Sequence, residues 1–353
     1  MTKILIYSDL HCSYTSSILP LFSANSEGNE KFTVRLNMII NTGKWLSALA
    51  EENKVDLIIN GGDTFDSIVV KAEELVGISE FFKAFNKLKC KHYVLVGNHE
   101  KVNESFNGSE IFSGFPNVEV IDKPKKITDE ISLLPYMSEK EITNKVLKDL
   151  SNKVLVSHID IQGSCLRDKY ILESGVNPEF LGAYFEFVAN GHLHTAEKLN
   201  TTQGQIWNIG GVSSISFVDN QEYIPSCVIY DTNTNSFVRY KNPYAILFRK
   251  LSVDSVKDLL KERKKLTDYK YVLSIKYSNY EQKVELQSIL DKTDNVLSYK
   301  LVNEVIDARS SKPDESIDLS ALDIKSKFEE FLDTSELKYD KKEYLKILRM
   351  VKK

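Results

Sequence analysis

Short apolar runs alternate with longer amphipathic segments over the first hundred residues. Residues 3–7, 55–59 and 93–96 are apolar without a helical repeat, which is typical of buried strands. Residues 34–52 and 71–88 instead repeat apolar side chains at helical spacing. The order strand, helix, strand, helix, strand predicts right-handed parallel crossovers, with helices covering the sheet.

The same patterns continue through the middle of the chain, with shorter elements. One helix is predicted at residues 139–150, and the last strand of the first domain is expected near residue 230. We therefore end this domain at residue 235. Its further strands are predicted at 118–121, 131–134, 153–156, 185–189, 206–209 and 227–230.

Two further regions follow the first domain. Residues 236–307 read as a small α/β domain, and residues 308–353 as a polar linker around Pro313 followed by two short helical segments. The elements predicted there are helices at 256–266, 280–290, 319–332 and 341–351 and strands at 271–277 and 296–302.

Composition places the chain among globular proteins and limits its partners. Of the 353 residues, 42% are hydrophobic and 27% are charged, and no segment resembles a signal peptide or a membrane span. We expect a cytoplasmic protein with no membrane partner. The net charge of −4 argues against binding nucleic acid by bulk charge alone. The four cysteines are widely scattered, so we predict neither disulfides nor a thiolate zinc site. They are Cys12, Cys90, Cys165 and Cys227.

Metal-binding side chains recur where predicted strands end. Five of the six histidines lie there, as do two aspartates and one asparagine, whereas His92 lies inside a predicted strand or at its start and is interpreted as structural. If the strand ends converge, the side chains form one cluster. Imidazole, carboxylate and amide ligands suit Mn²⁺, Fe²⁺ or Zn²⁺ better than Ca²⁺ or Cu⁺. The cluster comprises Asp9, His11, Asp63, Asn98, His99, His158, His192 and His194.

The number of candidate ligands favours two metal ions over one. One ion would use about half of the set, whereas two ions sharing a bridging carboxylate would use all of it. Two ions roughly 3.5–4 Å apart can stabilise both the attacking and the leaving oxygen in phosphoryl transfer. A single motif of this kind is a weak signal, because a loop histidine is more often a solvated or capping residue. Five such motifs in order predict phosphoester hydrolysis.

The five motifs resemble those of the calcineurin-like metallophosphoesterase superfamily. They are Asp9-Leu10-His11, Gly62-Asp63, Gly97-Asn98-His99-Glu100, His158 and Gly191-His192-Leu193-His194. The resemblance implies an α/β fold with a β-sandwich core flanked by helices. It also implies two metal sites that share Asp63, one completed by Asp9, His11 and His194 and the other by Asn98, His158 and His192.

The same resemblance gives roles to the two remaining polar residues of the third motif. His99 would face the phosphate, where it stabilises charge or protonates the leaving oxygen. Glu100 would orient the His99 imidazole, as carboxylates often do for functional histidines. The superfamily's nuclease members usually have Asp where this chain has Glu100.

More specific spacing is similar to the nuclease subunit of SbcCD-type recombination and repair complexes, in the compact form that phages encode. The similarity rests on Ser157 to Gly163, Gly175 to Leu181 and Gly210-Gly211. It implies a nuclease that uses two Mn²⁺ ions (or Mg²⁺, Fe²⁺ or Zn²⁺) in DNA repair, recombination and replication. The activity would be exonuclease on duplex DNA and endonuclease on single strands. If the chain is phage-encoded, it would act in the host cytoplasm.

The partners that this similarity implies are DNA and a coiled-coil ATPase. Residues 236–307 would contact DNA, and the helical segment in 308–353 would bind the ATPase, with two copies of the chain in a heterotetramer. The chain has no Walker-type loop, so any ATP dependence must come from another chain. The lysines at 123, 125, 126 and in 261–265 are candidate phosphate contacts, although solvated faces explain such runs more often.

Two other functions remain open at this stage. The first is a small-molecule phosphodiesterase or protein phosphatase, favoured by Glu100 but not by residues 64–67, Thr-Phe-Asp-Ser, which lack a phosphate-gripping arginine. The second is a non-catalytic scaffold. A scaffold is expected to lose metal ligands, and none is missing from this chain.

Overall fold

The computed structural model describes most of the first 303 residues. The described residues are 2–14, 19, 31–103, 106–167, 170–217, 223–252, 269–291, 293 and 295–303. The helix predicted at 256–266, the linker and the two C-terminal helical segments lie outside these residues. None of the described helices is long and apolar enough to cross a membrane. The four cysteines are free, as predicted.

The first sheet has six strands and contains the predicted parallel crossovers. Strands β1 to β4 pair in parallel in chain order, and two antiparallel strands extend the sheet beyond β1. The sheet order is β14 (Ser236–Lys241), β13 (Ser226–Asp231), β1 (Lys3–Tyr7), β2 (Leu57–Asn60), β3 (Lys91–Leu95) and β4 (Val118–Ile121). Helices α1 (Val34–Glu52) and α2 (Ala72–Lys83) are the two crossovers between β1 and β3.

The second sheet also has six strands. Its central strands β6, β7, β10 and β12 are parallel, and short antiparallel strands close both edges. The order is β11 (Glu197–Leu199), β12 (Gln205–Asn208), β10 (Phe185–Asn190), β7 (Asn152–Ser157), β6 (Ile131–Leu134) and β5 (Lys125–Lys126). Helices α3 (Asn144–Leu150) and α4 (Pro178–Tyr184) accompany it.

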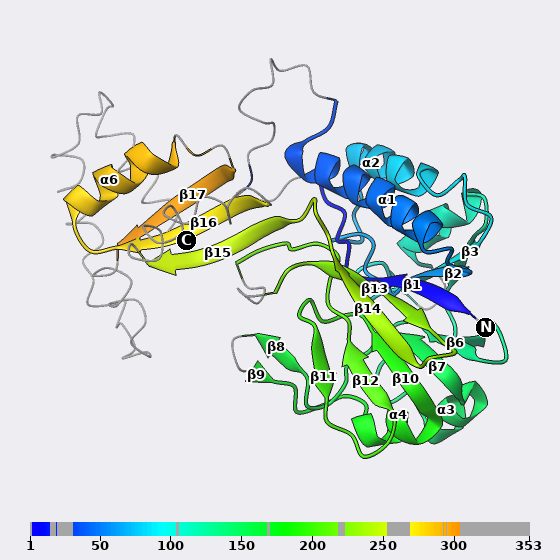
Figure 1. Cartoon of the computed structure of the whole chain (residues 1–353). Coiled ribbons are helices and arrows are strands. Elements are labelled where there is room, and N and C mark those ends of the chain that lie inside the picture. Colours follow the sequence, from blue (N-terminus) through cyan, green and yellow to red (C-terminus); the bar gives the residue numbers. More distant parts are fainter. Residues whose placement is uncertain are drawn as a thin grey trace, which may run out of the picture. The chain divides into compact units, whose positions relative to one another are not determined.

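The two sheets pack face to face, with helices on their outer faces (Figure 1). The inner layer joins Ile4 and Leu95 of the first sheet to Val154 and Phe187 of the second, all of them buried. Burying each such side chain stabilises the fold by about 1.5–3 kcal/mol. The predicted α/β class, with a β-sandwich core flanked by helices, is confirmed.

Several element boundaries differ from the prediction. The helix predicted from residue 139 begins at Asn144, because the Thr143 side chain caps it and Ser138 and Glu141 form a turn before it. Strand β14 extends the first sheet beyond residue 235, because it pairs with β13 along six residue pairs. The proposed division of the chain into three domains remains a prediction.

A third sheet of three parallel strands follows the sandwich. Its order is β15 (Ile246–Ser252), β16 (Lys270–Tyr277) and β17 (Val296–Asn303), with helix α6 (Tyr280–Leu290) between the last two. The remaining elements are the 3-10 helix η1 (Gly108–Gly114) and the hairpin of β8 (Cys165–Arg167) and β9 (Tyr170–Ile171). The strands and helix predicted for residues 271–302 are thus present.

His92, the histidine outside the motif pattern, is buried within β3. Its Nε2 lies 3.0 Å from the Tyr7 hydroxyl, and its ring contacts Phe82 and Phe85. Burial lowers the pKa of His92 to about 3. The structural interpretation of this residue is confirmed.

The low pKa of His92 predicts a pH dependence of stability. Below the ordinary histidine pKa of about 6.5, the unfolded chain binds a proton that the folded chain does not, so stability falls as pH falls. Between pH 6.5 and 5 the loss should be about 1.5–2 kcal/mol. Urea unfolding of wild type and His92→Gln checks this. The variant should be less stable at pH 7, but its free energy of unfolding should fall less between pH 6.5 and 5. An equal fall in both proteins would contradict the low pKa of His92.

Candidate metal centre

The five motifs lie at the carboxyl ends of five strands, each of which pairs in parallel with a neighbour in its own sheet. Those after β1, β2 and β3 come from the first sheet, and those after β7 and β10 come from the second. The cluster is therefore built between two sheets rather than along the edge of one. Each predicted ligand has its place there, namely Asp9 and His11 after β1, Asp63 after β2, Asn98 and His99 after β3, His158 after β7, and His192 and His194 after β10.

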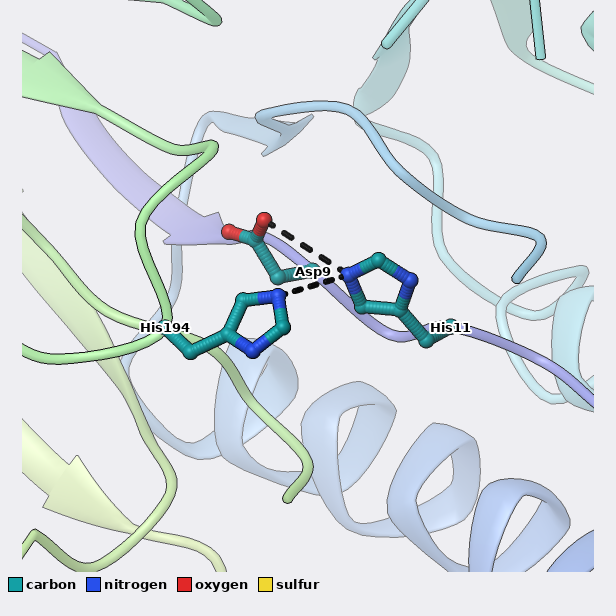
Figure 2. A group of neighbouring side chains, drawn as sticks. All are labelled: Asp9, His11 and His194. Carbon is teal, nitrogen blue, oxygen red and sulfur yellow. Dashed lines mark hydrogen bonds and ion pairs between the residues drawn. The ribbon is translucent and has the colours of Figure 1, made fainter. Parts of the chain in front are cut away.

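Asp9, His11 and His194 converge on one point (Figure 2). The Nε2 atoms of the two histidines lie 2.9 Å apart, and His11 Nε2 lies 3.9 Å from Asp9 Oδ1. Asp9 is fully buried, and neither carboxylate oxygen has a hydrogen-bond partner among the described residues. Burial also lowers the pKa of His11 and so favours the neutral imidazole, the form that binds metal. An unpaired buried carboxylate is costly, and a cation at this point would neutralise it.

Asp63 lies between this group and the second one. Its Oδ2 is 3.8 Å from His11 Nε2 and 3.3 Å from His158 Nε2, while its Oδ1 accepts a hydrogen bond from the His99 backbone N–H. Burial acts to raise the pKa of Asp63, but His158 and His11 outweigh burial and hold it well below its usual range. One oxygen of Asp63 is thus available to both groups, as a bridging ligand requires.

The second group comprises His158, His192 and the amide of Asn98. His158 Nε2 lies 3.2 Å and His192 Nδ1 lies 2.9 Å from Asn98 Oδ1. The other nitrogen of His158, Nδ1, lies 2.6 Å from the Gly61 carbonyl oxygen. Burial opposes protonation of His158, but the Asp63 carboxylate outweighs it and raises the pKa to about 9. A bound cation would take the place of that proton.

The backbone holds several ligands in an unusual conformation. Asp9, His11, Asp63 and His192 have φ values of 54°, 46°, 51° and 72°, all in the left-handed region. Such residues cost on the order of 1–3 kcal/mol each and persist only where the surroundings fix them. Here the loops after β1 and β2 bond to each other, through Asp9 N to Gly62 O and His11 N to Asp63 O, both at 3.0 Å.

Two glycines leave room for the ligands. A Cβ at Gly97 would lie 2.1 Å from Asp63 Oδ1, and a Cβ at Gly62 would lie 2.4 Å from His158 Nδ1. Gly62 also has a φ of 103°. The glycines of the Gly-Asp and Gly-Asn-His motifs are therefore required by close approach of the ligands themselves.

Glu100 does not bond to the His99 imidazole, contrary to the role that the resemblance implied. Its buried carboxylate accepts hydrogen bonds from the backbone N–H groups of Phe65, at 2.7 Å, and Gly97, at 2.8 Å. His99 Nδ1 instead lies 2.7 Å from the Asp66 carbonyl oxygen. Burial and the nearby Asp63 charge raise the pKa of Glu100 to about 8. Glu100 thus fastens the loop after β2 to the loop after β3.

Three residues near the centre were not singled out from the sequence. Asp66 Oδ1 lies 3.3 Å from His11 Nδ1, and Asp160 Oδ1 lies 3.0 Å from His192 Nε2. Arg35 is buried in α1 and donates hydrogen bonds to the carbonyl oxygens of His11, at 2.9 Å, and Ser214, at 2.7 Å. The only sequence signals were a second aspartate three residues after Asp63 and an aspartate two residues after His158.

The donor set fits two divalent cations. It offers imidazole nitrogens and carboxylate oxygens in three overlapping groups, with the Asn98 amide oxygen beside His158 and His192, which is the chemistry expected for metals such as Mn²⁺, Fe²⁺ and Zn²⁺. The fold therefore places a candidate two-metal centre between two stacked sheets.

Comparison of the sequence with protein families agrees with this assignment. The calcineurin-like phosphoesterase family model matches residues 2–196, more than half of the chain. The chain therefore belongs to that family, whose members hydrolyse phosphoesters with divalent metal ions. No curated protein sequence matches it significantly.

Several solved structures are similar at low identity. They include an archaeal phosphodiesterase (13% identity, TM-score 0.35), the protein TT1561 of Thermus thermophilus (8%, 0.42) and a dimetal phosphatase from Danio rerio (9%, 0.38). Each alignment covers 68% of this chain and 99% of the other chain.

Proposed function

We propose that this phosphoesterase is a two-metal DNA nuclease. Asp63 carries the proposal, because one oxygen of a single buried carboxylate faces His11 on one side and His158 on the other. Asp9, His11, Asp63 and His194 would hold one ion, and Asp63, Asn98, His158 and His192 the other. When bound, such a pair of ions supplies Lewis-acid stabilisation of the attacking and leaving oxygens. Mn²⁺ is the ion that we expect.

His99 is the residue that we assign to proton transfer. Its side chain is 36% exposed, so a phosphate in the centre can reach it, and its Nε2 lies 4.0 Å from Asp63 Oδ2. The Asp66 carbonyl oxygen accepts from Nδ1 and fixes the ring. Only the imidazolium form, protonated on both nitrogens, has a proton on Nε2 that can pass to the leaving oxygen or stabilise charge on the phosphate. Glu100 supports this step by fixing the loop that carries His99, through Gly97 N.

The case for DNA rests on sequence spacing and on the additional region after the phosphoesterase core. The third sheet and α6 follow the sandwich, and hydrolysis of a small phosphoester does not require them. In SbcCD-type nucleases the corresponding regions contact DNA and a coiled-coil ATPase. We extend the proposal to exonuclease action on duplex DNA, endonuclease action on single strands, and a heterotetramer with two copies of such an ATPase.

The geometry weakens the case for a protein phosphatase. Glu100 motivated that alternative, but its carboxylate contacts backbone N–H groups and not the His99 ring. Arg35 donates hydrogen bonds to the backbone carbonyl oxygens of His11 and Ser214. A small-molecule phosphodiesterase remains the second candidate, since it would use the same seven ligands.

Purified protein incubated with Mn²⁺ and labelled DNA tests the proposed function. Linear duplex and single-stranded substrates should be cut, and EDTA should stop the reaction. A panel of cyclic nucleotides, phosphopeptides and aryl phosphoesters serves as the comparison. Faster turnover of any of these than of DNA, or no DNA cleavage with the metal shown to be bound and the ATPase present, would contradict a nuclease.

A further inference from the structure

The carboxylate of Asp160 contacts His192, one of the predicted ligands, at the ring nitrogen that is not bonded to Asn98. Its Oδ1 lies 3.0 Å from Nε2 of His192, while Nδ1 of the same ring lies 2.9 Å from Asn98 Oδ1. The two nitrogens of His192 are therefore divided, one toward the candidate metal site and one toward Asp160. Among the described residues, His192 is the only ion-pair partner of Asp160.

We propose that Asp160 is a positioning residue for the second metal site, acting through His192. A carboxylate that accepts the Nε2 proton leaves the lone pair on Nδ1, where a metal ligand needs it, and it makes the imidazole a stronger donor. The two nitrogens of His158 are also divided, but with their roles exchanged. Nδ1 faces the Gly61 carbonyl oxygen and Nε2 faces Asp63. The two histidines of this site are thus each oriented by an oxygen acceptor on the outer nitrogen.

The backbone at Asp160 and at the residue before it is anchored by hydrogen bonds, which limits how far the Asp160 carboxylate can move from His192. The Asp160 carbonyl oxygen accepts from Val176 N at 2.9 Å. The preceding residue, Ile159, exchanges two hydrogen bonds with the buried Asn190 side chain, at 3.0 and 2.9 Å. A Cβ at Gly175 would lie 2.7 Å from the Asp160 carbonyl oxygen, which shows how closely the next loop packs against it.

The contact between Asp160 and His192 differs from an ordinary exposed salt bridge, because the imidazole is largely buried. Asp160 is 44% exposed but His192 only 17%, and the ring also packs against Tyr136 at 6.0 Å between centroids. The imidazole is therefore held on two sides, by Tyr136 and by the carboxylate. Removing the carboxylate should leave the fold intact and free the ring to rotate or to change its tautomer.

Titration calorimetry with Mn²⁺ on the full-length chain tests the inference. The role of Asp160 rests on the two-metal centre proposed above, so wild type must first bind two ions. Binding of fewer than two ions would overturn both the two-metal centre and the role of Asp160. Asp160→Ala should weaken the second binding event by about 10–100-fold and leave the first unchanged. Asp160→Asn keeps an acceptor oxygen for Nε2–H and should recover much of the loss. Asp129→Ala, on an exposed turn, is the control and should behave as wild type.

A spectroscopic readout separates positioning from general damage. At an Mn²⁺ concentration that saturates wild type, Asp160→Ala should show a larger fraction of the mononuclear Mn²⁺ electron paramagnetic resonance signal. Its thermal unfolding in EDTA should match that of wild type. An isotherm and spectrum indistinguishable from wild type, with the fold intact, would overturn the assignment while leaving the two-metal centre in place.

Discussion

Asp63→Asn is expected to reduce phosphoester hydrolysis more than about 1,000-fold, beyond the effect of deleting one transition-state hydrogen-bond donor. Asn keeps the size and the hydrogen bond from His99 N but removes the negative charge that faces His11 and His158. Without that charge, two nearby cations repel each other and have no shared ligand. Loss of one or both metals should therefore accompany the loss of activity.

Metal analysis and thermal unfolding check this prediction together. Wild type at an Mn²⁺ concentration of 100 times the dissociation constant should gain about 2.7 kcal/mol of stability, whereas Asp63→Asn should gain little. Asp149→Asn, an exposed substitution on α3, removes the same charge far along the chain and is the control. An Asp63→Asn protein that retains two ions and near-normal hydrolysis would exclude Asp63 as the bridge.

His99→Ala is expected to lower hydrolysis by about 10²–10⁴-fold while both metals remain bound. The ring is partly exposed and is held at Nδ1 by the Asp66 carbonyl oxygen, so Nε2 is free to face a phosphate. His99 is not among the seven predicted ligands, and its hydrogen bond to Asp63 uses the backbone N–H that alanine keeps, so its removal should spare the metal sites. Loss of a metal in this variant would instead make His99 a ligand, as its closeness to His11 and Asp63 also permits.

The leaving group distinguishes the two roles of His99. Nitrophenolate is a weak base and can leave without being protonated. The sugar alkoxide that leaves from DNA is a strong base and needs a proton. If His99 protonates the leaving oxygen, His99→Ala should lose far more activity on DNA than on bis-nitrophenyl phosphate. Equal losses on both substrates would favour charge stabilisation. Unchanged rates on both would disprove any catalytic role.

Local sequence patterns were sufficient for much of the fold. The bounds of β1, α1, β4 and β6 agree with the prediction residue for residue, because each is a clear apolar run or helical repeat. Thr33 additionally caps α1 through a bond from Leu36 N. The start of α3 was missed because residues 138–143 carry a helix-like pattern but close a turn through Ser138 and Glu141.

The candidate site could be predicted as a set of residues but not as an arrangement. Strand-end motifs identified the candidate ligands, yet only the packing of two sheets brings the β7 and β10 loops to those of β1, β2 and β3. The contact with His99 that the resemblance implied for Glu100 is absent, because the turn directs its carboxylate to the backbone N–H groups of Phe65 and Gly97. Asp160 and Asp66 act through long-range contacts that no local pattern records.

A crystal structure of the protein grown with Mn²⁺, with anomalous scattering measured at the manganese edge, tests the two-metal claim most directly. We predict two anomalous peaks, one ligated by Asp9, His11, Asp63 and His194 and the other by Asp63, Asn98, His158 and His192. Asp63 should contact both peaks, and His99 should contact neither. A single peak, or two peaks that do not share Asp63, would contradict the account.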